Sequence, residues 1–108
     1  SDVWTDGALP RGFACFGTEP FWSLAPQGGD LVLSGPDRKD DPHPIQSVLG
    51  TGIFRDPMRA VVAEGLTLTA VPRQCSDGMS DRVFGLRAHA VIHGQTPRLL
   101  SGCCHIRP

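Results

Sequence analysis

Four cysteines are the residues of this 108-residue chain best suited to form covalent cross-links or bind a metal ion: Cys15, Cys75, Cys103 and Cys104. An even number of cysteines in a short chain is typical of disulfides formed in an oxidising compartment. Adjacent cysteines rarely bond to each other, because the eight-membered ring strains the peptide between them, so two crosswise pairings remain open. In an extended segment, neighbouring side chains point to opposite faces. Cys103 and Cys104 would then fix two different parts of the structure.

The alternative use of these thiols is a metal site. Cys75, Cys103, Cys104 and His105 carry the soft ligands that zinc prefers, but zinc sites usually include a spaced C-x-x-C pair, which the chain lacks. Disulfides are therefore favoured, and they predict a secreted, periplasmic or surface-anchored protein without a metal or other cofactor. Closing loops of roughly 29 and roughly 90 residues would contribute about 3.6 and about 4.6 kcal/mol.

Glu19 stands beside a proline and two adjacent aromatic residues in the string GTEPFWSL at residues 17–24. On a strand, Phe21 and Trp22 would point to opposite faces. The simpler interpretation is that one ring packs in the core and the other covers an open end or lies under a loop, because aromatic rings bury the most area in a small core. The alternative is that Glu19 and the outward ring form part of a binding surface.

The string CSDGMSDR at residues 75–82 predicts a turn at Asp77 and Gly78, in which the glycine takes a positive φ. Cys75 would anchor this turn covalently, and Asp81 would pair with Arg82 or another basic group. Cation binding by Asp77 and Asp81 is a weaker alternative, because calcium loops supply more oxygen ligands at alternating positions. Recognition of a partner by an ordered polar loop is a further alternative.

Histidines and carboxylates form no recognisable catalytic arrangement. His43 lies in a charged stretch, His89 and His93 share a polar strand face, and His105 lies near the end of the chain, so all four are expected to be exposed to solvent. A strand would separate His89 from His93 by roughly 13 Å, too far for one metal ion. Hydrolysis of a glycosidic bond usually needs two carboxylates. The candidates are Glu19, Glu64, Asp77 and Asp81, and their spacing in the sequence does not show whether any two lie together. By analogy with other small disulfide-linked β-domains, we expect no catalytic activity.

The composition predicts one globular domain over residues 1–108, in which residues 1–10 form an irregular arm. Thirteen glycines and ten prolines disfavour long helices, while 40% hydrophobic residues and a net charge of -1 exclude a disordered chain. Ten basic residues against eleven acidic residues argue against nucleic acid or an anionic membrane as the main partner. No apolar run is long enough for a transmembrane helix. Residues 1–10 do not resemble a signal peptide, so an exported protein would have had its targeting segment removed.

Short alternating stretches between turn residues predict an all-β fold, a small antiparallel barrel or sandwich of about eight strands. Residues 35–44, with five charges and three prolines, are expected to form an exposed loop. Residues 56–65 could form a short helix, but the β-branched Val61 and Val62 favour a strand that ends in a hairpin turn at Glu64 and Gly65. The other expected strands are residues 13–16, 21–25, 31–34, 45–54, 66–71, 82–93 and 97–106.

The strings GTEPFW and CSDGMSDR, together with Gly102-Cys103, resemble an uncharacterised family of small bacterial envelope proteins, many of them lipoproteins. The resemblance extends from Cys15 to Cys104, and the eight-residue string is far more specific than a single glycine motif. It implies a periplasmic or envelope-anchored protein. It also implies that Cys75 pairs with Cys103, the usual cysteines of the family, and that Cys15 and Cys104 form an additional pair. It implies no established activity.

We therefore expect a non-catalytic binding or interaction module, similar in architecture and compartment to the small periplasmic lysozyme-inhibitor barrels, although none of their site residues is present. Its partner would be an envelope or extracellular protein or a cell-wall component. The alternative is a barrel that binds a small ligand or a metal ion at its mouth. The binding hypothesis places five residues together at one rim: Glu19, Trp22, Asp77, Asp81 and Arg82.

Overall fold

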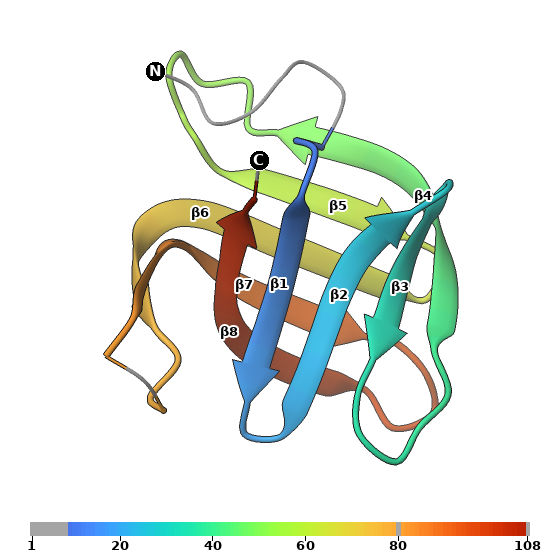
Figure 1. Cartoon of the computed structure of the whole chain (residues 1–108). Coiled ribbons are helices and arrows are strands. Elements are labelled where there is room, and N and C mark those ends of the chain that lie inside the picture. The colour runs from blue at the N-terminus through green and yellow to red at the C-terminus, as the bar shows by residue number, and fades with distance from the viewer. Residues whose placement is uncertain (1–8, 80, 108) are drawn as a thin grey trace.

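The computed structural model describes residues 9–79 and 81–107, which form a closed antiparallel barrel of eight strands (Figure 1). Each strand pairs with the next along the chain, and the last strand pairs with the first. The predicted all-β fold is therefore confirmed, as a barrel rather than a sandwich. The strands are β1 (Phe13–Thr18), β2 (Phe21–Gln27), β3 (Asp30–Ser34), β4 (Asp41–Gly50), β5 (Arg59–Ala63), β6 (Leu66–Ser76), β7 (Val83–Ile92) and β8 (Arg98–Ile106).

The first eight residues of the expected N-terminal arm lie outside the described residues, and residues 9 and 10 precede β1 without joining a strand. Within the described part of the chain, no helix has the length and hydrophobicity needed to cross a membrane.

The interior of the barrel is filled by side chains, because alternate residues of the strands point inward. Leucines of β2, β3 and β6 are fully buried, and the predicted apolar face of β7 is buried from Leu86 to Ala90. These residues form one core with β5 and with the inward side chains of β1 and β8. The depressions described below lie on the outer surface.

The expected loop at residues 35–44 was wrong at its end, because β4 already begins at Asp41. The N–H of Ile45 donates to the carbonyl oxygen of Gly29 beside β3, whereas the carbonyl oxygen of Pro44 accepts a bond from Glu64 on the opposite side. Amide groups alternate in direction along a strand. The missing N–H groups of Pro42 and Pro44 therefore face away from β3 and remove no bond from the β3–β4 ladder.

The strand interpretation of residues 56–65 is confirmed: β5 runs from Arg59 to Ala63, and Gly65 takes a φ of +74° in the following turn. β4 ends at Gly50, before the expected end at residue 54, so a loop connects it to β5. Asp56 accepts hydrogen bonds in this loop from the Thr51 hydroxyl (2.7 Å) and the Met58 N–H (3.1 Å). This ordered loop exposes 85% of Phe54 and 71% of Ile53.

Both disulfides implied by the family resemblance are present. Cys15 of β1 lies directly opposite Cys104 of β8, and their bond lies in the interior of the barrel. Cys75 and Cys103 belong to a separate apolar cluster on the outside, with Phe84 and Phe16. The adjacent cysteines therefore face opposite sides of the barrel wall, as expected. The alternative in which these thiols bind zinc is excluded, because all four sulfur atoms are in disulfides.

Candidate functional site

The end of the β6–β7 hairpin lies over the outer face of β1 and β8, and we call residues 75–79 and 81–84 the hairpin tip. In Figure 1 this connection extends beyond the barrel wall on the side of β8. The β6–β7 register shifts between Pro72 and Cys75, and such an irregularity bends a strand. The pairing of β7 with β8 ends at Leu86 and Cys104, so that Val83 and Phe84 are free to follow the bend.

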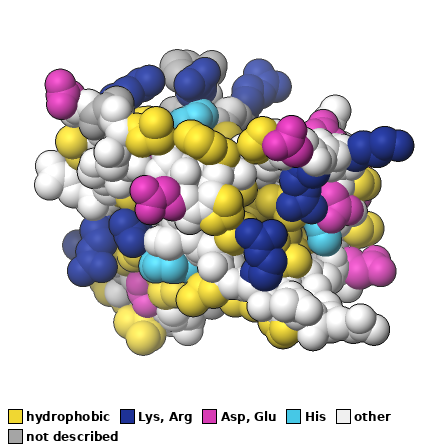
Figure 2. All heavy atoms as spheres, turned by 90° about the horizontal axis from the view of Figure 1, so that it is seen from below, with side chains coloured by type: hydrophobic (Ala, Val, Ile, Leu, Met, Phe, Trp, Pro, Cys, Tyr) yellow, Lys and Arg dark blue, Asp and Glu magenta, His cyan; other side chains and the backbone are white. Residues whose placement is uncertain are grey.

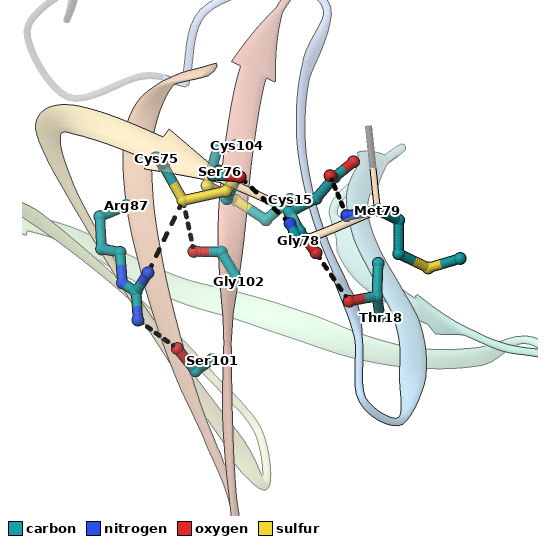
Figure 3. Close-up of a disulfide and its surroundings, with 12 residues drawn as sticks. Cys15, Thr18, Cys75, Ser76, Gly78, Met79, Arg87, Ser101, Gly102 and Cys104 are labelled. Atoms are coloured by element: carbon teal, nitrogen blue, oxygen red, sulfur yellow. Dashed lines mark hydrogen bonds between the residues drawn. A yellow bond between two sulfur atoms is a disulfide. The ribbon is translucent and has the colours of Figure 1, made fainter. Parts of the chain in front are cut away.

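Three contacts hold the hairpin tip against the barrel. The Cys75–Cys103 disulfide joins it to β8. The Phe84 ring packs edge-on against Phe16 of β1, with ring centroids 4.8 Å apart. The Thr18 hydroxyl donates a hydrogen bond of 2.9 Å to the carbonyl oxygen of Asp77 (Figure 3). Covalent, apolar and polar contacts thus fix the tip at three separate points.

An open groove of about 260 Å³ lies between the hairpin tip and the barrel wall. It brings together the two strings that the sequence analysis selected, because Glu19 and Asp77 both line it although they are distant in the chain. This agrees with the predicted proximity of these two residues. The groove, as the term is used below, is lined by Phe16, Gly17, Thr18, Glu19, Ser76, Asp77, Gly78, Met79, Arg87, Ser101 and Gly102.

The wall on the side of the hairpin tip is the predicted polar turn. Gly78 takes a φ of +79°, which favours glycine, and its N–H donates to the Ser76 hydroxyl oxygen. The Asp77 carboxylate accepts a bond of 2.9 Å from the Met79 N–H. The turn is therefore ordered by its own side chains as well as by the disulfide.

Arg87 supplies a cation at the opposite wall, and sequence reasoning did not select it. Its guanidinium donates a bond of 2.9 Å to the Ser101 hydroxyl, and a second nitrogen lies 3.9 Å from the sulfur of Cys75 (Figure 3). The same sulfur lies 3.3 Å from the carbonyl oxygen of Gly102. Arg87 is thus held in place across β7 and β8. Together with Glu19, it gives the groove charged side chains of both signs.

Trp22 does not belong to an exposed rim, which corrects the prediction. Only 5% of its surface is exposed, whereas the neighbouring Phe21 is 54% exposed. The indole fits in the core because two glycines leave room for it. A Cβ atom at Gly17 would lie 2.0 Å from the indole nitrogen, and one at Gly102 would lie 2.9 Å from the indole ring. The outward ring of the aromatic pair is therefore Phe21.

Arg82 lies in a second depression, which adjoins the groove at Phe16, and the exposed Asp81 lines neither of the two. This basic depression has a volume of about 280 Å³. The five predicted rim residues thus divide between the groove, the core, the basic depression and the open surface. The basic depression is lined by Ala14, Cys15, Phe16, Ser23, Arg82, Phe84, His105 and Arg107.

His105 was expected to be exposed to solvent, but its ring packs beside Phe16 and Phe84, at centroid distances of 5.6 and 6.3 Å. Desolvation lowers the pKa of His105 below its ordinary value, and the positive charges of Arg107 and Arg82 lower it further. One sequence signal could have located this residue: strand alternation places Ser101, Cys103 and His105 on one face of β8.

His43 is the other histidine whose surroundings differ from the expectation. It lies on β4 rather than in a loop, and 13% of its side chain is exposed. Its ring nitrogens lie 2.6 Å from the carbonyl oxygen of Glu64 and 3.0 Å from the Asp41 carboxylate. These contacts connect the start of β4 to the turn between β5 and β6. Among residues 9–79 and 81–107, no three His, Cys, Asp or Glu side chains are grouped to hold a metal ion.

Charges of both signs are interspersed with hydrophobic side chains on the face shown in Figure 2, which views the barrel from below. On that face, neither the basic nor the acidic side chains form one continuous patch. Comparison of this chain with protein-family models, curated proteins and solved structures gave no significant match.

Proposed function

We propose that this protein is a non-catalytic binding module of an extracytoplasmic compartment, and that the groove holds an extended polar segment of a protein partner. The observation that carries this proposal is the convergence of both sequence strings on one groove, at a hairpin tip held by a disulfide. Binding residues are often found on loops that a rigid scaffold positions.

The chemistry of the groove suits a polypeptide. A peptide backbone presents donors and acceptors in alternation, and the groove offers hydroxyl groups of Thr18, Ser76 and Ser101 together with backbone groups of the turn. Glu19 and Arg87 add charges of opposite sign beside the Asp77 carboxylate, and these charges would fix the direction and register of a charged segment.

The disulfides support the extracytoplasmic part of the proposal. All four cysteines are buried, at 0–2% exposure, and each is joined to a partner. Structural disulfides of this kind persist in oxidising compartments and are rare in the cytosol. The family resemblance implies the same location.

Site-specific photocrosslinking tests the proposal. A photoreactive residue at Met79, which lines the groove and is 67% exposed, should crosslink one partner protein in an envelope fraction. The same residue at Leu99, which is 70% exposed but lies outside the groove, is the matched control and should not crosslink it. Equal crosslinking from both positions would contradict the proposal. An adduct that muramidase digestion removes would instead identify cell-wall glycan as the partner and would overturn the polypeptide assignment.

Substitution of two oppositely charged groove residues gives a second test. Glu19→Gln and Arg87→Met should each weaken capture of the crosslinked partner by about tenfold or more, since a charge-assisted hydrogen bond contributes about 1.5–3 kcal/mol. Glu64→Gln and Arg98→Met are controls outside the groove. Circular dichroism should show the same fold in all four variants. Full capture by both groove variants would refute the assignment of these charges.

A further inference from the structure

The loop between β4 and β5, residues 51–58, presents apolar side chains to solvent at one end of the barrel. In Figure 1 this β4–β5 loop rises beyond the barrel wall, at the end opposite to the β1–β2 turn that carries Glu19. Single exposed hydrophobic residues are common on protein surfaces, whereas a group of them in one short stretch indicates a contact surface. The exposed large hydrophobic residues of this stretch are Leu49, Ile53, Phe54 and Met58.

Hydrogen bonds within the loop and from Arg59 pair both the N–H and the C=O groups of Ile53, Asp56 and Met58. The Ile53 N–H donates to the Thr51 hydroxyl oxygen (3.2 Å), and the Ile53 carbonyl oxygen accepts from the Asp56 N–H (3.1 Å). The Met58 N–H donates to the Asp56 carboxylate (3.1 Å). The Arg59 guanidinium donates to the carbonyl oxygens of Asp56 (3.0 Å) and Met58 (2.8 Å). These three residues can therefore leave water without exposing an unpaired backbone group.

A cation lies beside the most exposed ring of the loop. The guanidinium of the exposed Arg55 is 5.0 Å from the centre of the Phe54 ring. The neighbouring acid, Asp56, uses its carboxylate inside the loop, where it accepts bonds from Thr51 and Met58. An exposed guanidinium next to exposed apolar side chains suits the boundary between lipid headgroups and acyl chains.

We propose that the β4–β5 loop docks reversibly onto a lipid bilayer. Ile53 and Phe54 enter the boundary between headgroups and acyl chains, and Arg55 contacts the headgroup phosphates. The internally paired backbone fits this environment, because acyl chains offer no hydrogen bonds to amide groups. The net charge of -1 gives no general attraction to lipid, so the contact depends on the apolar side chains. This proposal does not depend on the groove.

A second copy of the chain is a less suitable occupant of this surface. One large aromatic side chain buries about 150–250 Å², so the exposed parts of four apolar side chains amount to roughly a few hundred Å². A stable protein interface buries about 800 Å² on each partner. A protein strand that paired with the loop backbone would find the amides of Ile53, Asp56 and Met58 already bonded.

Vesicle flotation of the full chain tests the proposal. The probes are phosphatidylcholine vesicles and vesicles of equal parts phosphatidylcholine and phosphatidylglycerol, and the chain should bind both. Phe54→Ser and Ile53→Ser should each weaken binding about tenfold or more. Arg55→Gln should weaken binding to the anionic vesicles about fivefold. Leu99→Ser is the matched control, because Leu99 is 70% exposed but lies on β8, and it should leave binding unchanged.

Nuclear magnetic resonance with nitroxide-labelled lipid locates the contact. Amide resonances of Ile53 and Phe54 should broaden, whereas those of Met79 and Leu99 should not. Absence of binding to both vesicles would overturn the proposal, as would full binding by both the Phe54→Ser and the Ile53→Ser variants. A dimer that forms without lipid and that Phe54→Ser dissociates in sedimentation velocity would identify a second copy as the occupant and would also overturn it.

The two proposed surfaces can fail separately. Glu19→Gln should leave vesicle binding unchanged, and Phe54→Ser should leave the crosslink from Met79 unchanged. Loss of vesicle binding with an intact crosslink would overturn only the lipid contact, and the reverse result would overturn only the assignment of the groove.

Discussion

The two disulfides should contribute unequally to stability, and only one of them should be needed to form the groove. The substitutions that test this are the paired variants Cys15→Ala/Cys104→Ala and Cys75→Ala/Cys103→Ala. The first bond joins residues 89 apart in the chain and the second joins residues 28 apart. The chain-entropy relation assigns them about 4.6 and about 3.6 kcal/mol respectively. Both are large fractions of a typical stability of about 5–15 kcal/mol.

The order should be reversed for the local stability of the hairpin tip, because the Cys75–Cys103 bond joins the tip to β8 and the Cys15–Cys104 bond does not. Without the Cys75–Cys103 bond, the hairpin tip loses its covalent link to β8 and is held by non-covalent contacts, among them the Thr18 hydrogen bond and the contact between Phe16 and Phe84. Amides of the tip, such as that of Met79, should then exchange hydrogen faster than in the intact protein. Removal of the interior bond leaves all three tip contacts in place, so exchange at the tip should change little relative to global unfolding.

Urea unfolding measures the two free energies, and hydrogen exchange resolved by residue measures the tip. Greater destabilisation by loss of the 28-residue link than by loss of the 89-residue link would refute the loop-length argument. Unchanged exchange at the tip after removal of Cys75 and Cys103 would refute the argument that this bond forms the groove. The crosslink from Met79 should also disappear in that variant.

Three further predictions concern single residues. Gly102→Ala should destabilise the barrel by about 3 kcal/mol in urea unfolding, because its Cβ would lie 2.0 Å from a backbone oxygen, whereas Gly85→Ala, with nothing within 4 Å, should cost less than about 0.5 kcal/mol. The pKa of His105 is lowered in the folded state, so the unfolded chain binds the proton more readily and stability should decrease as pH falls from above the ordinary value of 6.5 through the lowered folded value. His105→Gln should remove this part of the pH dependence, and an unaltered profile would show that another group is responsible. Phe54→Ser should change the unfolding free energy, measured by urea unfolding, by less than about 0.5 kcal/mol, since the ring is 85% exposed.

The strands could be predicted from sequence because their signal is local. Alternation along residues 83–92 identified the buried face of β7, and turn residues marked most of the ends. The prolines at 42 and 44 made the start of β4 look like a loop. A proline is tolerated in a strand only where its missing N–H faces away from the paired neighbour, and the sequence of the segment does not show on which side that neighbour lies. That information lies in residues 29 and 64, which are outside the segment.

The site was predicted only in part, because its composition depends on long-range contacts. Glu19 and Asp77 were expected to lie together and do line one groove. The choice between Phe21 and Trp22 as the outward ring depends on Gly17 and Gly102, and the latter is far along the chain. Arg87 and His105 enter the two depressions because the β6–β7 hairpin bends, and no periodic pattern encodes that bend.

The adjacent Cys103 and Cys104 also make the disulfide pairing depend on how the barrel closes. The seam between β1 and β8 joins the first strand of the barrel to the last. A slip of β8 by one residue along this seam would exchange the faces to which the two cysteines point. Cys103 would then lie inside, and Cys104 would lie outside beside Cys75. Only the correct alignment allows both native bonds to form, so the pattern of oxidation reports whether the first and last strands have met in register.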